Sequence, residues 1–225
     1  MAQTLCLTAF RRRLPAYAMA LLLAMTALPA SPAKAFVAET LKLDKSEMTD
    51  LMRVQKHLNS ARTIRSRFLQ ISSNGEYTEG EFFLQRPGKM CLVYDPPNPL
   101  MVVADGKYIS YVDRELDQAT TLLISMTRAQ ILLKETIALF GDDVIVTGFR
   151  RSPGIIRVNV VNAAEPTEGR IDLVFSDKPL ELRKWLVTDA QGITTTVSLL
   201  GPLFNTELDP ELFRYSEPIF KDLDK

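Results

Sequence analysis

Residues 64–113 read IRSRFLQISSNGEYTEGEFFLQRPGKMCLVYDPPNPLMVVADGKYISYVD, and within them apolar and polar side chains alternate with a period of two. This period is typical of β-strands, whose successive side chains point to opposite faces of a sheet. Turn-forming residues interrupt it, among them Ser73-Asn74-Gly75, Arg86-Pro87-Gly88 and Asp105-Gly106. The pattern predicts five strands, over residues 64–72, 77–85, 89–95, 100–104 and 107–113.

The same alternation returns towards the C-terminus, and helical spacing occurs at two places between and before the strands. One helix is predicted over 46–59, with Ser46 as its cap, and a second from the capping-box pair Thr127 and Gln130 to Gly141. Further strands are predicted over 144–149, 155–161, 170–176, 182–188 and 193–200.

About ten consecutive strands joined by short turns predict an antiparallel meander. Two helices cannot cover both faces of so large a sheet. We therefore expect a mainly β fold with helices (α+β): a single curved antiparallel sheet, forming an unclosed β-barrel with the helices packed over its concave face. Periodicity alone leaves two interiors open, a solid core or an incompletely filled one that holds an apolar ligand.

The first 35 residues have the composition of an export signal. Arg11, Arg12 and Arg13 precede an apolar run over 16–28, and Ala33-Lys34-Ala35 forms an A-x-A site. We predict a secretory signal peptide over 1–35, cleaved after Ala35, and a soluble mature domain over 36–225. The apolar run, about 13 residues long, is shorter than the roughly 20 residues of a membrane-spanning helix.

The distribution of charged residues and of cysteines also differs between residues 1–35 and residues 36–225. The chain has 27 basic and 27 acidic residues. Residues 1–35 hold four basic residues and no acidic one, so residues 36–225 hold 23 basic and 27 acidic residues. No cysteine stands at the end of the apolar run, where a bacterial lipoprotein carries its acylated thiol. Cys6 leaves with the signal, and Cys91 lies in an apolar run that predicts a buried strand residue.

The sequence contains none of the common catalytic motifs. There is no H-E-x-x-H, C-x-x-C or G-x-S-x-G, and no phosphate-binding glycine-rich loop. The single histidine, His57, lies in the first predicted helix, where a surface or core role is expected. We predict no enzyme activity, no catalytic residue, no metal site and no cofactor. Nucleic acid is not an expected partner of an exported chain without a basic surplus.

Several short motifs follow one another over residues 45–218. In chain order they are F-x-Q at 68–70, EGEF at 79–82, RPG at 86–88, YDPP at 94–97, ADGK at 104–107, D-x-x-G at 189–192 followed by Thr194-Thr195, and F-x-Y at 213–215 before Pro218. Each motif is short, but their order and spacing together resemble the periplasmic outer-membrane lipoprotein carrier family, LolA.

This resemblance implies an unclosed β-barrel with a helical lid over a hydrophobic cavity. It implies a monomeric periplasmic carrier that takes triacylated lipoproteins from an inner-membrane ABC transporter complex and delivers them to an outer-membrane receptor lipoprotein, LolB. The missing acylated cysteine favours the carrier over the receptor. The family's R-P arginine, which bonds to the lid and couples its closure to cargo release, matches Arg86, and Met90 matches a position near the mouth of the cavity.

The strand pattern and the resemblance together give the candidate site. Arg86 is the expected lid latch, with an ordinary turn arginine as its alternative. The expected lipid-binding residues of the cavity are Phe68, Phe82, Leu84, Met90, Leu92, Tyr94, Leu133 and Ile137. Two departures concern this set: Leu92 stands where the family often has an aromatic residue, and the lone Trp185 lies far along the chain. Alternative functions are a periplasmic lipid-binding sensor or regulator, and a carrier of another lipid, with the same fold.

Overall fold

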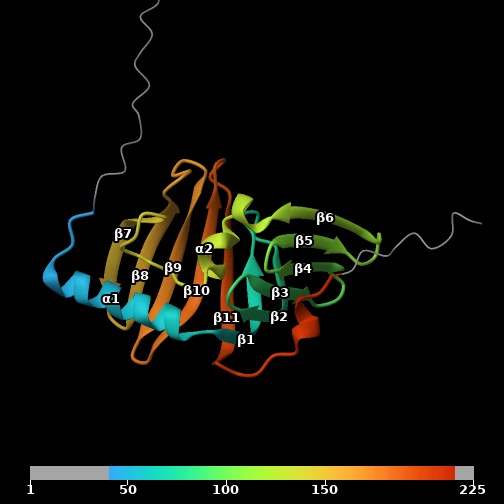
Figure 1. Ribbon diagram of the computed structural model, residues 1–225, viewed down its shortest axis with the longest axis horizontal. Coiled ribbons are helices and arrows are strands. Elements are labelled where there is room, and N and C mark those ends of the chain that lie inside the picture. Colours follow the sequence, from blue (N-terminus) through green and yellow to red (C-terminus); the bar gives the residue numbers. More distant parts are fainter. Residues whose placement is uncertain (1–40, 216–225) are drawn as a thin grey trace, which may run out of the picture. The chain divides into compact units, whose positions relative to one another are not determined.

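The period-two segments form one antiparallel sheet of 11 strands in the computed structural model, which describes residues 41–215 (Figure 1). The chain order of the strands differs from their order in the sheet, which is β6-β5-β4-β3-β2-β1-β11-β10-β9-β8-β7. The strands are β1 (Thr63–Ile71), β2 (Tyr77–Gln85), β3 (Lys89–Tyr94), β4 (Leu100–Asp105), β5 (Tyr108–Asp113), β6 (Gln118–Leu123), β7 (Val144–Ser152), β8 (Ile155–Asn162), β9 (Gly169–Asp177), β10 (Leu180–Asp189) and β11 (Thr194–Phe204).

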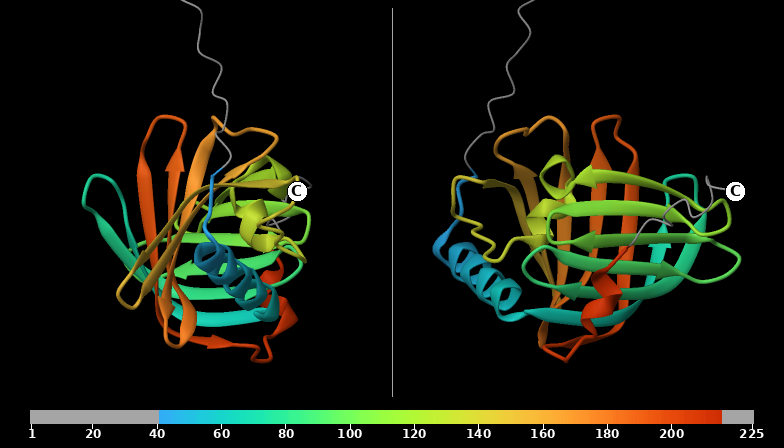
Figure 2. Two further views of the ribbon diagram at one scale, coloured as in Figure 1. Left: turned by 90° about the vertical axis from the view of Figure 1, so that its left-hand side faces the viewer. Right: turned by 45° about the vertical axis from the view of Figure 1, so that its right-hand side comes forward.

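The sheet consists of two meanders that join where β1 pairs with β11. β6 and β7 are its two edges, so the described sheet is not closed into a barrel. The register shifts where β11 meets β1, where β10 meets β9 and where β7 meets β8, and such irregularities let strands bend. Figure 2 shows the curved sheet with helical segments on its concave side. The predicted unclosed antiparallel sheet is confirmed.

The first helix, α1 (Lys45–Ser60), is capped one residue before its start. The side chain of Asp44 accepts a hydrogen bond from the backbone N–H of Glu47, and the Glu47 carboxylate accepts one from the backbone N–H of Asp44, which is a complete capping box. The prediction that Ser46 is the cap is therefore wrong, because the acidic pair satisfies the free N–H groups two residues earlier. The buried face of α1 includes Leu51, Val54 and Leu58.

A network of charges fastens α1 to the sheet. Arg53 of α1 lies 2.7 Å from Asp50 and 3.2 Å from Asp177, at the end of β9. Arg151 of β7 pairs with the same two carboxylates, at 3.0 Å for Asp177. Because both carboxylates are buried, at 4% and 8% exposure, and each is shared by two arginines, the network fixes the direction in which α1 crosses the sheet.

The second helix is much shorter than predicted. A 3₁₀ turn, η1 (Ile124–Met126), precedes α2 (Ala129–Leu133), and residues 134–143 contain no α-helix. Side chains of α1 take over the hydrogen bonds that a longer helix would make. The amide oxygen of Asn59 accepts from the Ile137 N–H and its amide nitrogen donates to the Ile137 carbonyl, while the Gln55 amide oxygen accepts from the Leu139 N–H.

The Thr127–Gln130 capping box is also absent, because the Thr127 hydroxyl donates to the carbonyl of Ile124 and α2 has no side-chain cap.

The sheet has an eleventh strand, β6, which the alternation of apolar and polar residues did not predict. β6 pairs only with β5 and is exposed at five of its six positions, so no burial pattern of period two marks it.

Apolar side chains pack on both faces of the sheet. The larger cluster lies between the sheet and the helical segments, and a smaller one joins Phe83, Cys91 and Val103 to Phe213 of the 3₁₀ turn η2 (Pro210–Phe213). Cys91 is buried, as predicted, and burial raises the pKa of its thiol to about 11. No helix among residues 41–215 is both long and apolar enough to cross a membrane.

Candidate functional site

An apolar cavity of about 500 Å³ opens between the sheet and the η1–α2 segment. This volume is within the range of small-molecule sites in proteins. Three groups of side chains enclose it, from the first meander, the second meander and the η1–α2 segment. They are Gln70, Phe82, Leu84, Met90, Leu92, Tyr94, Val102, Ile109, Tyr111 and Leu122; Ile171, Trp185, Val187, Thr195 and Val197; and Met126, Thr127, Arg128, Ala129 and Leu132.

The structure separates the sequence-derived cavity residues into two groups. Five of them, Phe82, Leu84, Met90, Leu92 and Tyr94, line this cavity. The other three lie in the packed core beside it, at 0% exposure for Phe68, 2% for Leu133 and 1% for Ile137. Ile137 lies outside the cavity because the helix that would have carried it over the strands ends at Leu133. Leu132, the neighbour of Leu133, supplies the lining side chain instead.

Trp185 is the most informative lining residue that sequence reasoning missed. Its indole lies against Phe82, with ring centroids 5.3 Å apart, and it is 6% exposed. The irregularity between Leu182 and Lys184 changes the phase of alternation along β10. Leu182 and Trp185 are therefore both buried although they are three residues apart, a spacing that a strict period of two does not allow.

Few polar groups reach the cavity, and those at β1 and β3 bond to each other. The hydroxyl of Tyr94 donates to the amide oxygen of Gln70 at 2.8 Å. Burial raises the pKa of Tyr94, and the same cause raises the pKa of Tyr111. Both phenols therefore remain neutral at neutral pH, and the strand wall adds no charge to the cavity.

Arg86 connects the strand wall to both helices. Its Nε donates to the carbonyl of Leu132 at 2.8 Å, and its Nη1 donates to the carbonyls of Leu58 and Ala61, the latter at 2.9 Å. Arg86 is 6% exposed, and burial, together with the nearby charge of Arg62, lowers its pKa to about 10. It therefore stays charged at neutral pH, facing carbonyls at the C-terminal end of α1, where a cation is favoured.

The backbone reinforces this connection, since the N–H of Gly88 donates to the carbonyl of Leu133 at 2.8 Å. The R-P-G turn therefore contacts α1 and α2 together. A lid latch requires such contacts with both helical segments. That Arg86 couples closure of the lid to release of cargo is a proposal.

His57 has the environment of a packed residue. Its ring makes edge contacts with Phe175 and Phe204, at centroid distances of 6.2 and 5.5 Å, and its Nε2 is buried without a hydrogen-bond partner. Burial lowers the pKa of His57; Glu181 raises it and Arg86 lowers it further. Among residues 41–215, no group of three or more His, Cys, Asp or Glu side chains is placed to hold a metal ion.

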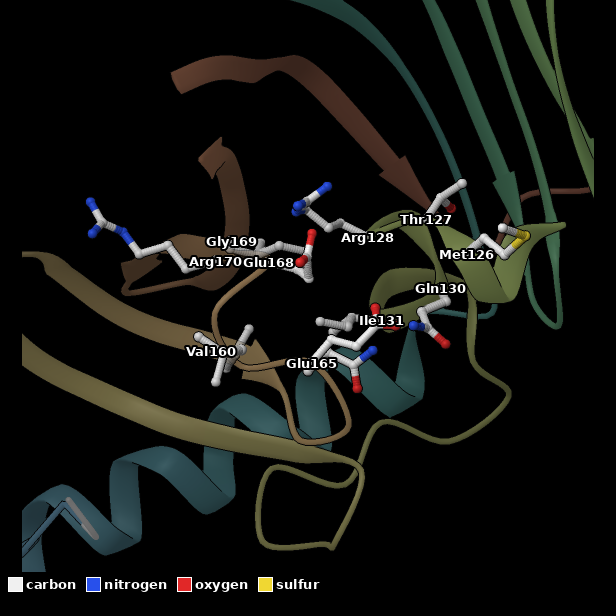
Figure 3. A pocket seen from close by; sticks show the side chains of 13 residues that line it. Met126, Thr127, Arg128, Gln130, Ile131, Val160, Glu165, Glu168, Gly169 and Arg170 are labelled. Atoms are coloured by element: carbon white, nitrogen blue, oxygen red, sulfur yellow. The ribbon is translucent and has the colours of Figure 1, made fainter. Parts of the chain in front are cut away.

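A second, smaller pocket of about 60 Å³ lies on the other side of α2 (Figure 3). It is lined by residues of the η1–α2 segment and of the turn between β8 and β9, among them Gln130, Glu165 and Glu168. It shares Met126, Thr127, Arg128 and Ile171 with the apolar cavity. These four residues therefore form the border between the smaller pocket, whose lining is mixed, and the apolar cavity.

A model of the family "Outer membrane lipoprotein carrier protein LolA" matches residues 59–216, which include every strand and the η1–α2 segment. The chain belongs to the LolA family. The match shows the family that the motif order indicated, and the lipoprotein carrier role that goes with its name. The Arg86 turn and the strands of the apolar cavity all lie within the matched LolA region.

Curated relatives extend this LolA match over most of the chain. Two similar proteins are named "Outer-membrane lipoprotein carrier protein". The one from Pseudomonas syringae pv. syringae is 24% identical over 77% of this chain and 86% of the relative. The one from Nitrosospira multiformis is 28% identical over 78% of this chain and 88% of the relative. Among solved structures, a LolA superfamily protein of Nitrosomonas europaea matches with 7% identity over 73% of this chain and 97% of that one, at a TM-score of 0.42.

Proposed function

We propose that this chain is a periplasmic carrier that buries the acyl chains of triacylated lipoproteins in the cavity between its sheet and α2. It receives them from an inner-membrane ABC transporter complex and delivers them to the outer-membrane receptor LolB. The observation that carries the proposal is the apolar cavity of about 500 Å³, closed on one side by a short helical segment, in a chain of the LolA family.

The cavity addresses the central physical difficulty of such cargo. Each exposed CH₂ of an acyl chain costs about 0.8 kcal/mol in water, so a chain of ordinary length cannot cross an aqueous compartment uncovered. Side chains such as Phe82, Leu92 and Trp185 replace water around the chain without fixing it by polar bonds. A carrier of this kind holds its cargo by burial and needs no cofactor and no chemical reaction.

The helical cover supplies a part that can move. α2 has five residues, and the following segment is held to α1 by the side-chain bonds of Asn59 and Gln55. Such elements open at low free-energy cost compared with the strands of a sheet. We infer that cargo enters by displacing the η1–α2 segment, and that closure of this segment favours release onward.

The predicted signal over residues 1–35 supports export to the periplasm. This segment lies outside the described residues, so its cleavage after Ala35 stays a prediction. The carrier is expected to act as a monomer, because one molecule of cargo needs one cavity.

Trp185 provides a direct test, since it is the single tryptophan of the chain and it lines the cavity. A triacylated lipopeptide whose acyl chains carry bromine, a contact quencher, is expected to quench the emission of Trp185 in the protein purified from the periplasm. The same peptide without acyl chains is expected to have no effect. Fluorescence titration measures both.

A matched control moves the reporter out of the cavity. Tyr77 is 71% exposed and does not line the cavity, so a W185F/Y77W protein carries its one tryptophan at the surface. This protein is expected to bind the lipopeptide, as measured by sedimentation with radiolabelled ligand, without quenching. Equal quenching of both reporters, or binding without quenching of Trp185, would show that the acyl chains lie elsewhere.

A further inference from the structure

The apolar cavity contains one formal charge. Of the described residues that line it, Arg128 alone has a charged side chain. Its Nε is shielded from solvent and has no hydrogen-bond partner. A buried donor without an acceptor costs free energy, and the cost is greater when the donor belongs to a cation. Arg128 is half-buried, and its shielded Nε therefore remains available for an acceptor.

The fold makes room for this side chain at the border of the cavity. Arg128 is the first residue before α2 and extends towards Gly169, at the start of β9 (Figure 3). Gly169 has φ +131°, and a Cβ there would lie 2.6 Å from Nε of Arg128 and 2.2 Å from the carbonyl oxygen of Thr188. Only a glycine leaves space for the guanidinium against the strand edge.

The surrounding charges do not neutralise Arg128. Glu165 and Glu168 line the smaller pocket that Arg128 borders, but within residues 41–215 neither forms an ion pair with Arg128. The other arginine of this pocket, Arg170, is paired with Asp172 at 3.4 Å. Two hydroxyl groups of the lining already donate within the protein, Tyr94 to Gln70 and Thr127 to the carbonyl of Ile124. Arg128 thus offers a free donor at the edge of an apolar space.

We propose that Arg128 binds the acyl carbonyl oxygens of the cargo, at the point where the chains join the head group. This inference rests on the proposed function. Ester and amide carbonyls lose their water when the chains enter the cavity, and they can accept but not donate hydrogen bonds. A cationic donor whose Nε is already shielded from solvent compensates this loss, so the site selects acylated cargo over a plain hydrocarbon of equal length.

The test compares two ligands and two variants. The ligands are a triacylated lipopeptide and an analogue whose ester and amide carbonyls are replaced by methylene groups. Arg128→Met keeps most of the side-chain volume and removes the donor. Arg170→Met is the matched control, because Arg170 lines the smaller pocket and not the apolar cavity. Affinities are measured by quenching of Trp185.

The natural protein is expected to bind the acylated peptide more tightly than the analogue. Arg128→Met is expected to lose about tenfold or more in affinity for the acylated peptide and little for the analogue. Arg170→Met is expected to bind both ligands as the natural protein does. Retained binding of the analogue by Arg128→Met also shows that the variant is folded. If Arg128→Met does not fold, as judged by circular dichroism, Arg128→Lys is tested instead. It keeps a cationic donor and is expected to retain most of the preference for the acylated peptide, and equal affinity for both ligands would count against the inference.

Two results would overturn the inference alone: an unchanged ligand preference in Arg128→Met, or an equal loss for both ligands. Failure of the natural protein to bind either ligand would instead overturn the proposed function, and the inference with it.

Discussion

An Arg86→Leu variant is expected to load lipoprotein normally and to transfer it to the receptor about tenfold more slowly, or worse. The guanidinium joins three carbonyls, those of Leu58, Ala61 and Leu132, and so holds the two helical segments to the strands. Leucine leaves these buried acceptors without that donor, at about 1–3 kcal/mol each where nothing replaces it. The closed, empty state is thereby destabilised, and the loaded state is not.

The closed state excludes cargo, so closure of the helical cover and binding of cargo oppose each other. A substitution that destabilises the closed state therefore slows the release of cargo. A ligand's apparent affinity rises when the state that excludes it becomes less stable, by tenfold for each 1.4 kcal/mol. Arg86→Leu therefore holds its cargo too tightly. The measurement is transfer of radiolabelled lipoprotein from the loaded carrier to membranes that contain the receptor.

Arg62 supplies the control for this experiment. It is exposed, lies close enough to influence the pKa of Arg86, and donates to the carbonyl of Glu135 at 3.3 Å. Arg62→Leu removes the same charge without removing the bonds to Leu58 and Leu132, so transfer is expected to stay near normal. Normal transfer by Arg86→Leu would refute the latch.

Gly80→Ala is expected to lower the free energy of unfolding by about 3 kcal/mol, the upper end of the cost of overpacking a core. A Cβ at this position of β2 would lie 2.1 Å from the carbonyl oxygen of Val93 and 2.7 Å from the ring of Phe68. The first contact is with backbone of the paired strand, which cannot rotate away. For a domain of this size the melting temperature is expected to fall by roughly 6–12 °C, measured by circular dichroism.

Gly75→Ala is the comparison that isolates the steric cause. Gly75 has φ +86° but nothing within 4 Å of an added Cβ, so its substitution costs only the backbone strain, about 1 kcal/mol. Gly80 is expected to be the more sensitive position. A larger loss of stability in Gly75→Ala than in Gly80→Ala would contradict the close packing of Phe68 beneath β2.

Strand period and turn residues were sufficient to predict ten of the eleven strands of the sheet. Asp105-Gly106 and Ser152-Pro153-Gly154 lie between paired strands, and alternation in segments such as 170–176 has a direct physical origin in the pleat. β6 escaped prediction because an exposed edge strand has no buried face to create alternation.

The helical cover could not be predicted from local sequence, because its hydrogen bonds are tertiary. Residues 134–143 have helical apolar spacing, but Asn59 and Gln55 of α1 bond to their backbone and stabilise another conformation. Phe140, which lies within the predicted helix, is 48% exposed. The prediction that Leu133 and Ile137 line the cavity relied on a helix that extends to Gly141, whereas α2 ends at Leu133.

The cavity itself is only partly visible in the sequence. The apolar faces of β2 and β3 contribute Phe82, Leu84 and Leu92, as alternation indicates. The opposite wall, with Trp185, depends on the change of phase in β10. Alternation reports that a face is covered, but whether protein atoms or a space lie above it depends on where the cover ends. Here α2 stops after five residues and leaves that space.

The most direct test of the carrier role is depletion of this protein in its own cell, followed by fractionation of the two membranes. Lipoproteins destined for the outer membrane are expected to accumulate in the inner membrane, and restoring the natural chain is expected to return them to the outer membrane. Normal sorting after complete depletion, in a cell without a second carrier, would contradict the account.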